Sequence, residues 1–180
     1  MFPMRGTYTE GLTMKSMIKR KVDISLNAHI EMVQQVVLDA YEIQKDRRIR
    51  HDLDPTDRGN MLYYRMLRQT GHTAVLKKLL SEKFQNENGV NIFGVFHTAR
   101  ERDTFFTQPR NITTGEWYEK FDRKEKTATI TQFMGSKIDK ADIIVFSDTL
   151  HDAKRLSVAH KMLQDNRICF TNLTLVVFLG

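Results

Sequence analysis

Two short apolar segments of the chain are each followed by polar residues that could take part in chemistry. His97 directly follows residues 90–96, and Asp148 follows residues 143–146 after a single serine. Ligands of open α/β sheets bind beyond the carboxyl ends of the strands, so both side chains are expected at one edge of a sheet. A histidine can move protons near neutral pH, and Arg100 could hold a phosphate through charge-assisted hydrogen bonds. One hypothesis is therefore a small α/β enzyme that acts on a phosphorylated ligand, with His97, Asp148 and Arg100 as catalytic residues.

The same residues also fit a purely structural explanation, and no motif around them names a reaction. No glycine-rich phosphate loop accompanies His97, and no nucleophile elbow surrounds Ser147. Ser147 or Asp148 would cap a following helix, while His97 and the arginines after it would form a surface turn with ion pairs. The sequence therefore favours a protein without catalytic activity.

Residues 51–57 combine a histidine with three aspartates and invite comparison with metal sites. Their spacing matches no calcium loop and no zinc signature. Asp54 and Pro55 are instead typical of the cap and the first position of a helix. We expect neither a metal nor a cofactor.

An aromatic and basic patch in the second half of the chain suggests nucleic acid as an alternative ligand. Bases stack on aromatic rings while cations meet phosphates, and the net charge of +6 favours a polyanionic partner. The opposing explanation is that the aromatic side chains anchor a long connection to the core. The residues of this patch are Arg110, Trp117, Tyr118, Arg123 and Lys124.

The leading hypothesis is a structural subunit of a larger assembly, because both ends of the chain are rich in apolar residues. Residues 1–21 lack a helical or strand period and are expected to form an extended arm, whereas residues 173–179 should form a strand. Terminal segments are usually hydrophilic, so these two need cover from the chain's own sheet, from copies of the same protein or from other subunits. By analogy, connector and tail-ring proteins of virus and phage particles hold their termini in this way. The interface residues expected are Phe2, Met4, Met14, Met17, Leu175, Val177 and Leu179.

Hydrophobic periodicity divides the rest of the chain into a helical part and a part with short strands. Residues 22–88 show helical spacing, and residues 89–180 contain apolar runs typical of a sheet. Together they are expected to form one globular domain, residues 22–180, of the α+β or α/β class. The helices would pack on a small mixed sheet, and residues 143–179 would contribute one βαβ-like unit.

Three helices are expected in the first part. The second would begin at Asp54 and Pro55 and end near residue 71, and the third would span residues 73–84. The buried stripe of the first helix would consist of Ile30, Val33, Val37, Ala40 and Tyr41.

Composition limits where the protein is expected to work. No run approaches the ~20 apolar residues of a membrane-spanning helix, and the first residues lack the apolar core of a signal peptide. The single cysteine, Cys169, lies between Ile168 and Phe170, so we predict a buried thiol in a reducing compartment. We expect an intracellular protein, or a component of a virus or phage particle, without a membrane partner.

Overall fold

The apolar runs of the chain form a five-stranded sheet in which every pair of neighbouring strands is parallel. The computed structural model describes residues 26–65, 71–107, 124–135 and 138–180. Across the sheet the strands follow the order β1-β5-β4-β2-β3. Their bounds are β1 Leu62–Tyr64, β2 Ile92–Phe96, β3 Thr127–Thr129, β4 Ile143–Phe146 and β5 Leu175–Leu179.

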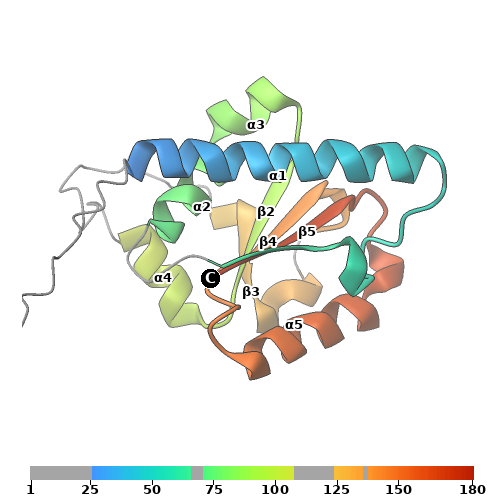
Figure 1. Cartoon of the computed structure of the whole chain (residues 1–180). Helices are drawn as coiled ribbons and strands as arrows, with labels where there is room; N and C mark the ends of the chain where they lie inside the picture. The colour runs from blue at the N-terminus through green and yellow to red at the C-terminus, as the bar shows by residue number, and fades with distance from the viewer. Residues whose placement is uncertain (1–25, 66–70, 108–123, 136–137) are drawn as a thin grey trace, which may run out of the picture.

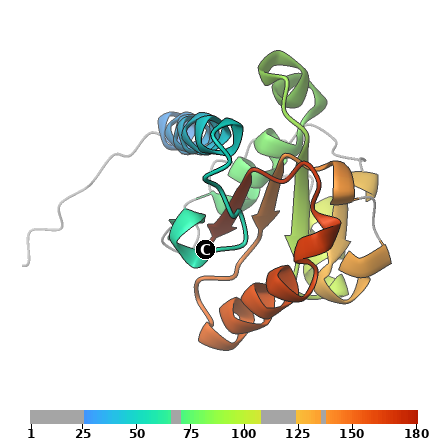
Figure 2. The same cartoon turned by 90° about the vertical axis from the view of Figure 1, so that its right-hand side faces the viewer.

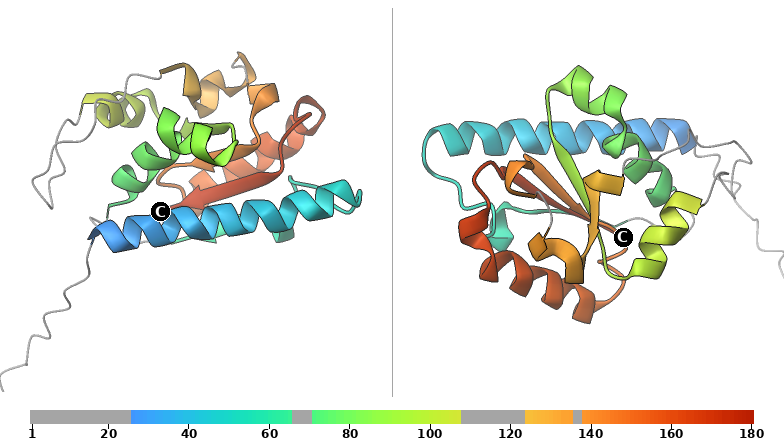
Figure 3. Two further views of the ribbon diagram at one scale, coloured as in Figure 1. Left: turned by 90° about the horizontal axis from the view of Figure 1, so that it is seen from above. Right: turned by 180° about the vertical axis from the view of Figure 1, so that it is seen from behind.

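Helices cover both faces of this sheet, which gives three layers (Figures 1 and 2). One face carries α1, α2, α3 and α4, and the opposite face carries α5. On the first face α1 runs beside β5 and α2 (Figure 3). The helices are α1 Leu26–Ile49, α2 His72–Leu80, α3 Glu82–Asn88, α4 Ala99–Thr107 and α5 Ala153–Asp165. Short 3-10 helices span Arg58–Asn60, Lys124–Lys126, Ile130–Gly135, Ile138–Lys140 and Arg167–Cys169. Even the long α1 lacks an apolar stretch that could cross a membrane, as does every other helix in the described part of the chain.

Alternating residues of the central strands point to opposite faces, and both faces are buried. Val145 and Val177 pack under α1 and α2, while Ile144 and Phe178 pack against α5, and all four are 0% exposed. Two covered faces explain why these strands are apolar at every position instead of at every second one.

The sheet differs from the expected mixed sheet in being wholly parallel, and it is not confined to the second half of the chain. The helix expected from Asp54 to about residue 71 is wrong over its described part. Asp54 accepts hydrogen bonds from the amide and the hydroxyl of Thr56 at 3.0 and 2.7 Å, which closes a turn. Leu62–Tyr64 then pairs with β5, because tertiary pairing overrides a weak local preference for helix.

Other boundaries also differ from the expectations. Ser81 divides the third expected helix, because its hydroxyl accepts from the amide of Phe84 at 3.3 Å and so caps α3. The strand expected over residues 127–133 continues as a strand only to Thr129. Cys169 is exposed on a 3-10 helix, so the prediction of a buried thiol is wrong.

The first helix and the βαβ unit agree with the sequence. The expected stripe of α1 faces the core, with Val33 and Val37 at 0% exposure. The unit β4-α5-β5 is present, and β5 lies between β1 and β4 inside the sheet. The apolar segment at residues 173–179 is therefore covered by the chain's own fold.

Candidate functional site

The direction in which the chain moves across the sheet reverses between β2 and β4, although the two strands are parallel. After β2 the chain crosses through α4 on one face to β3, and after β4 it crosses through α5 on the opposite face to β5. The two strands are neighbours and parallel, so their carboxyl ends meet at one point of the sheet edge. Ligands of open α/β sheets bind in the crevice at such a reversal.

The turn after β4 holds an unusual backbone conformation at this point. Asp148 has a φ of 52°, in the left-handed region that aspartate tolerates better than most residues. The amide of the next residue, Thr149, donates to the carbonyl of Leu179 at 3.1 Å, which ties the turn to the end of β5. A strained residue costs about 1–3 kcal/mol, and such residues cluster at functional sites, although His51 in the turn after α1 also has a positive φ of 57°.

His97 is oriented by this turn. Its Nε2 lies 2.9 Å from the Oγ1 of Thr149, and that hydroxyl donates its proton to the carbonyl of Ser147 at 3.2 Å. When the hydroxyl donates to this carbonyl it accepts from His97, an arrangement that favours the ring proton on Nε2 and the lone pair on Nδ1. Thr149 itself is 0% exposed, so it positions the imidazole and does not attack a ligand.

Arg155 on α5 links this helix to α4 across the carboxyl edge of the sheet. Its Nη2 lies 2.7 Å from Oε1 of Glu101 on α4, and its Nη1 lies 3.4 Å from Oδ2 of Asp148 and 3.3 Å from the Asp148 carbonyl. Glu101 also forms a capping box with Thr98, with hydrogen bonds of 3.1 and 3.2 Å. The side chains of Arg155 and Glu101 are 29% and 27% exposed, so solvent and small molecules can reach the pair.

Two further histidines surround the carboxylate of Asp148. His151 Nε2 lies 3.8 Å from Asp148 Oδ1. His72, at the start of α2, interacts electrostatically with Asp148 and His151. Burial lowers the pKa of His72, and Asp148 partly opposes this. Burial and then the Arg155 cation lower the pKa of His97. Both imidazoles are therefore neutral at pH 7 and can accept protons.

The structure brings two of the three predicted catalytic residues to this edge. His97 and Asp148 lie close enough for their charges to interact, whereas Arg100 is exposed and is not among the residues that act on His97. Arg155 supplies the guanidinium instead. Arg155, Glu101, Thr149 and His72 were not predicted as site residues from the sequence. The available signal was the position of Arg155 and Glu101 in the first turns of helices that follow strands.

Most of the other predicted site residues lie outside the described part of the chain or inside the core. Lys124 is exposed, with its Nζ 5.7 Å from the Phe106 ring centre and its carbonyl bound by Arg102 at 2.9 Å. The core residues are Leu175, Val177 and Leu179, which are 1%, 0% and 1% exposed and have no surface to offer a neighbour. Outside the described residues lie Phe2, Met4, Met14, Met17, Arg110, Trp117, Tyr118 and Arg123.

The acidic segment at residues 51–57 is used structurally. Asp54 closes its turn with Thr56 and forms an ion pair with Arg167 at 2.9 Å, and Asp57 accepts from the amide of Gly59. Nowhere in the described ranges do three histidine, cysteine or acidic side chains group closely enough to hold a metal ion.

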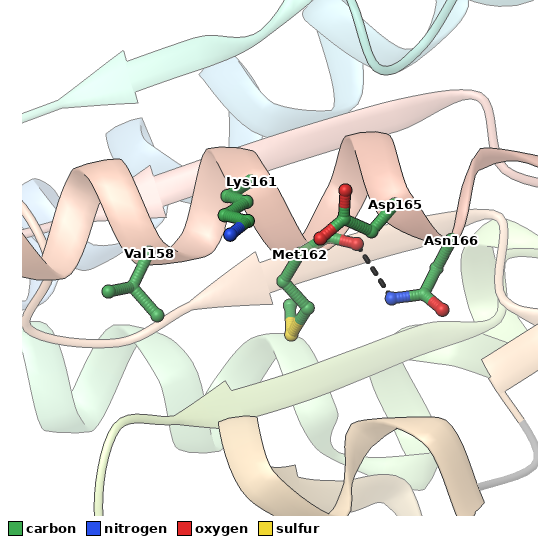
Figure 4. A pocket seen from close by; sticks show the side chains of 5 residues that line it. All are labelled: Val158, Lys161, Met162, Asp165 and Asn166. Atoms are coloured by element: carbon green, nitrogen blue, oxygen red, sulfur yellow. Dashed lines mark hydrogen bonds between the residues drawn. The ribbon is translucent and has the colours of Figure 1, made fainter.

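A hollow of about 410 Å³ lies on α5, away from this cluster. Val158 and Met162 lie one turn apart along it, and Asn166 closes one end with a 2.7 Å hydrogen bond to the Met162 carbonyl (Figure 4). The exposed wall is mostly apolar, and Lys161 and Asp165 also line the hollow.

Comparison with protein-family models, with curated proteins and with solved structures finds no match to this chain. The fold class defined by the structure is an α/β protein with a five-stranded parallel sheet.

The lowered pKa values predict that stability depends on pH. The unfolded chain binds protons on His72 and His97 near pH 6.5, whereas the folded chain binds them at lower pH. The contribution of these residues is full above pH 6.5 and is lost as the pH falls through the folded values, at up to about 1.4 kcal/mol per pH unit for each histidine. Urea unfolding between pH 5 and 7.5 measures this slope. We expect His97→Asn to flatten it and His51→Asn, at an exposed position, to leave it unchanged; an equal slope in all three proteins would contradict the assignment.

Proposed function

We propose that the protein is a small α/β enzyme that binds a polar ligand at the carboxyl edge between β2 and β4. The observation that supports this most directly is the 2.9 Å contact of His97 Nε2 with the buried hydroxyl of Thr149, from which we infer a proton on Nε2 and a lone pair on Nδ1. A base needs a fixed position and must be unprotonated at the working pH. The Thr149 hydroxyl fixes the imidazole of His97, and burial, which lowers its pKa, keeps it neutral.

Three roles follow for the surrounding residues. His97 acts as general base through Nδ1, and Thr149 is its positioning residue. Asp148 holds Arg155 and balances its charge, and its left-handed backbone places Thr149 under the imidazole. General base catalysis of this kind contributes ~10²–10⁴-fold to a rate.

A ligand screen followed by a single substitution tests this function. Thermal shift with sugar phosphates, nucleotides, amino acids and hydroxy acids should identify compounds that raise the melting temperature, and their conversion can then be followed by NMR. His97→Gln keeps an N–H donor for Thr149 but has no basic nitrogen, so binding should remain while turnover falls at least ~100-fold. His51→Asn is the control. Unchanged turnover in His97→Gln, or stabilisation by no compound, would contradict the proposal.

Assembly remains a second candidate function, and surface hydrophobicity on the α5 side favours it. Val158 is 50% exposed beside the hollow of Figure 4, and Ile168, two residues beyond Asn166, is 96% exposed. Exposed apolar patches are typical of protein–protein contacts, and of these two residues Val158 lines the hollow. A non-catalytic subunit would use this surface, because β5 is already covered by the chain's own sheet. Nucleic-acid binding stays a proposal based on charge and on residues outside the described ranges.

Light scattering at high concentration tests the assembly role. If α5 contacts another subunit, the full chain should form a defined oligomer that Val158→Asp dissociates, because burying an unpaired charge is costly. Ser157→Asp adds the same charge to a neighbouring exposed position and should leave the oligomer intact. A wild-type monomer, or equal effects of the two substitutions, would exclude this surface as the contact.

A further inference from the structure

Glu101 occupies the position that an anionic ligand would need at the carboxyl edge. Its Oε1 lies 2.7 Å from Arg155, a short charge-assisted contact, and its Oε2 accepts from the amide of Thr98 at 3.2 Å. The carboxylate therefore lies between a guanidinium and the backbone amide of Thr98 just before α4, and both kinds of donor bind phosphates and carboxylates in proteins.

The contacts of Arg155 limit what can replace Glu101. On its other side the guanidinium is held by the side chain and the carbonyl of Asp148, at 3.4 and 3.3 Å, so its place at the edge of the sheet does not depend on Glu101 alone. An anion that displaces Glu101 brings the charge that the guanidinium loses, and Arg155 is never left unpaired. The displaced carboxylate can move into water, because more than a quarter of its surface is already exposed.

We propose that Glu101 is an internal stand-in for the phosphate or carboxylate group of the ligand, and that it keeps the site closed until such a group displaces it. This proposal deepens the function proposed above and rests on it, since it names the anionic group of the ligand and the contact that regulates access. Arg155 is the residue that binds this group, whereas the sequence had suggested Arg100 as the residue that holds a phosphate.

Substitution of Glu101 by glutamine isolates the stand-in role. Glutamine serves as well as glutamate in a capping box, so Glu101→Gln keeps the hydrogen bond to Thr98 and removes the charge that competes for Arg155. Titration calorimetry of the full chain with inorganic phosphate and, separately, with acetate should show affinity about tenfold higher than in the wild type for at least one of the two. Preference for phosphate or for acetate then identifies the group that the ligand carries.

Two comparisons complete the experiment. Glu87→Gln removes the acid of an exposed pair with Lys83, so it controls for the general change in net charge and should bind both anions like the wild type. Glu101→Gln combined with Arg155→Met should lose the gain. If circular dichroism shows that this double variant is unfolded, Glu101→Gln combined with Arg155→Lys should still reduce the gain in anion affinity, because lysine cannot form the bidentate contact.

The outcomes separate this proposal from the function on which it rests. Equal anion affinity in Glu101→Gln and the wild type, or a gain that persists without Arg155, would overturn the stand-in role. If His97-dependent turnover is found while the anion affinity stays unchanged, the enzyme proposal stands and this one fails. If neither His97-dependent turnover nor a gain in anion affinity is found, the carboxyl edge of the sheet is excluded as a site.

Discussion

The central constraint on this fold is that β4 lies between two parallel neighbours under helices on both faces. Ile143 pairs with Ile92 on one side and Leu175 on the other, and no side chain of β4 reaches solvent. A polar side chain within the strand would lose its hydration without gaining a partner. Groups that do chemistry are therefore confined to the strand ends. Because β2 and β4 are parallel neighbours, their carboxyl ends meet at the point where the chain moves apart in the two directions across the sheet.

At the carboxyl edge one cation is shared between carboxylates of two other elements. Arg155 of α5 pairs with Glu101 of α4 and with Asp148 of the β4 turn, which leaves one negative charge in excess, while neutral His72 and His97 add no charge. Partly buried pairs of this kind hold their geometry because removal of one partner leaves the other charge uncompensated. Under the proposed stand-in role the cluster has two states, one in which Arg155 binds the internal carboxylate and one in which it binds an external anion.

Much of the fold could be predicted from hydrophobic runs, because β2, β4 and β5 are apolar at every position and α1 has one regular stripe. The segment from Asp54 to Tyr64 could not, since its cap-like start closes a turn and its pairing with β5 depends on contacts distant in sequence. The site was predicted in part for the same reason. His97 and Asp148 follow strands directly, which sequence shows, whereas the pairing of Arg155 with Glu101 depends on two helices on opposite faces of the sheet.

The ring of His97 offers the most direct test, because its proton position can be measured without a ligand. ¹⁵N NMR of the imidazole at pH 8 distinguishes a proton on Nε2 from one on Nδ1, and Thr149→Val removes the hydroxyl with little change of shape. The structure predicts the Nε2–H tautomer in the wild type and a mixture of tautomers in Thr149→Val. A proton on Nδ1 in the wild type, or identical spectra for the two proteins, would contradict the assignment of His97 as a positioned base.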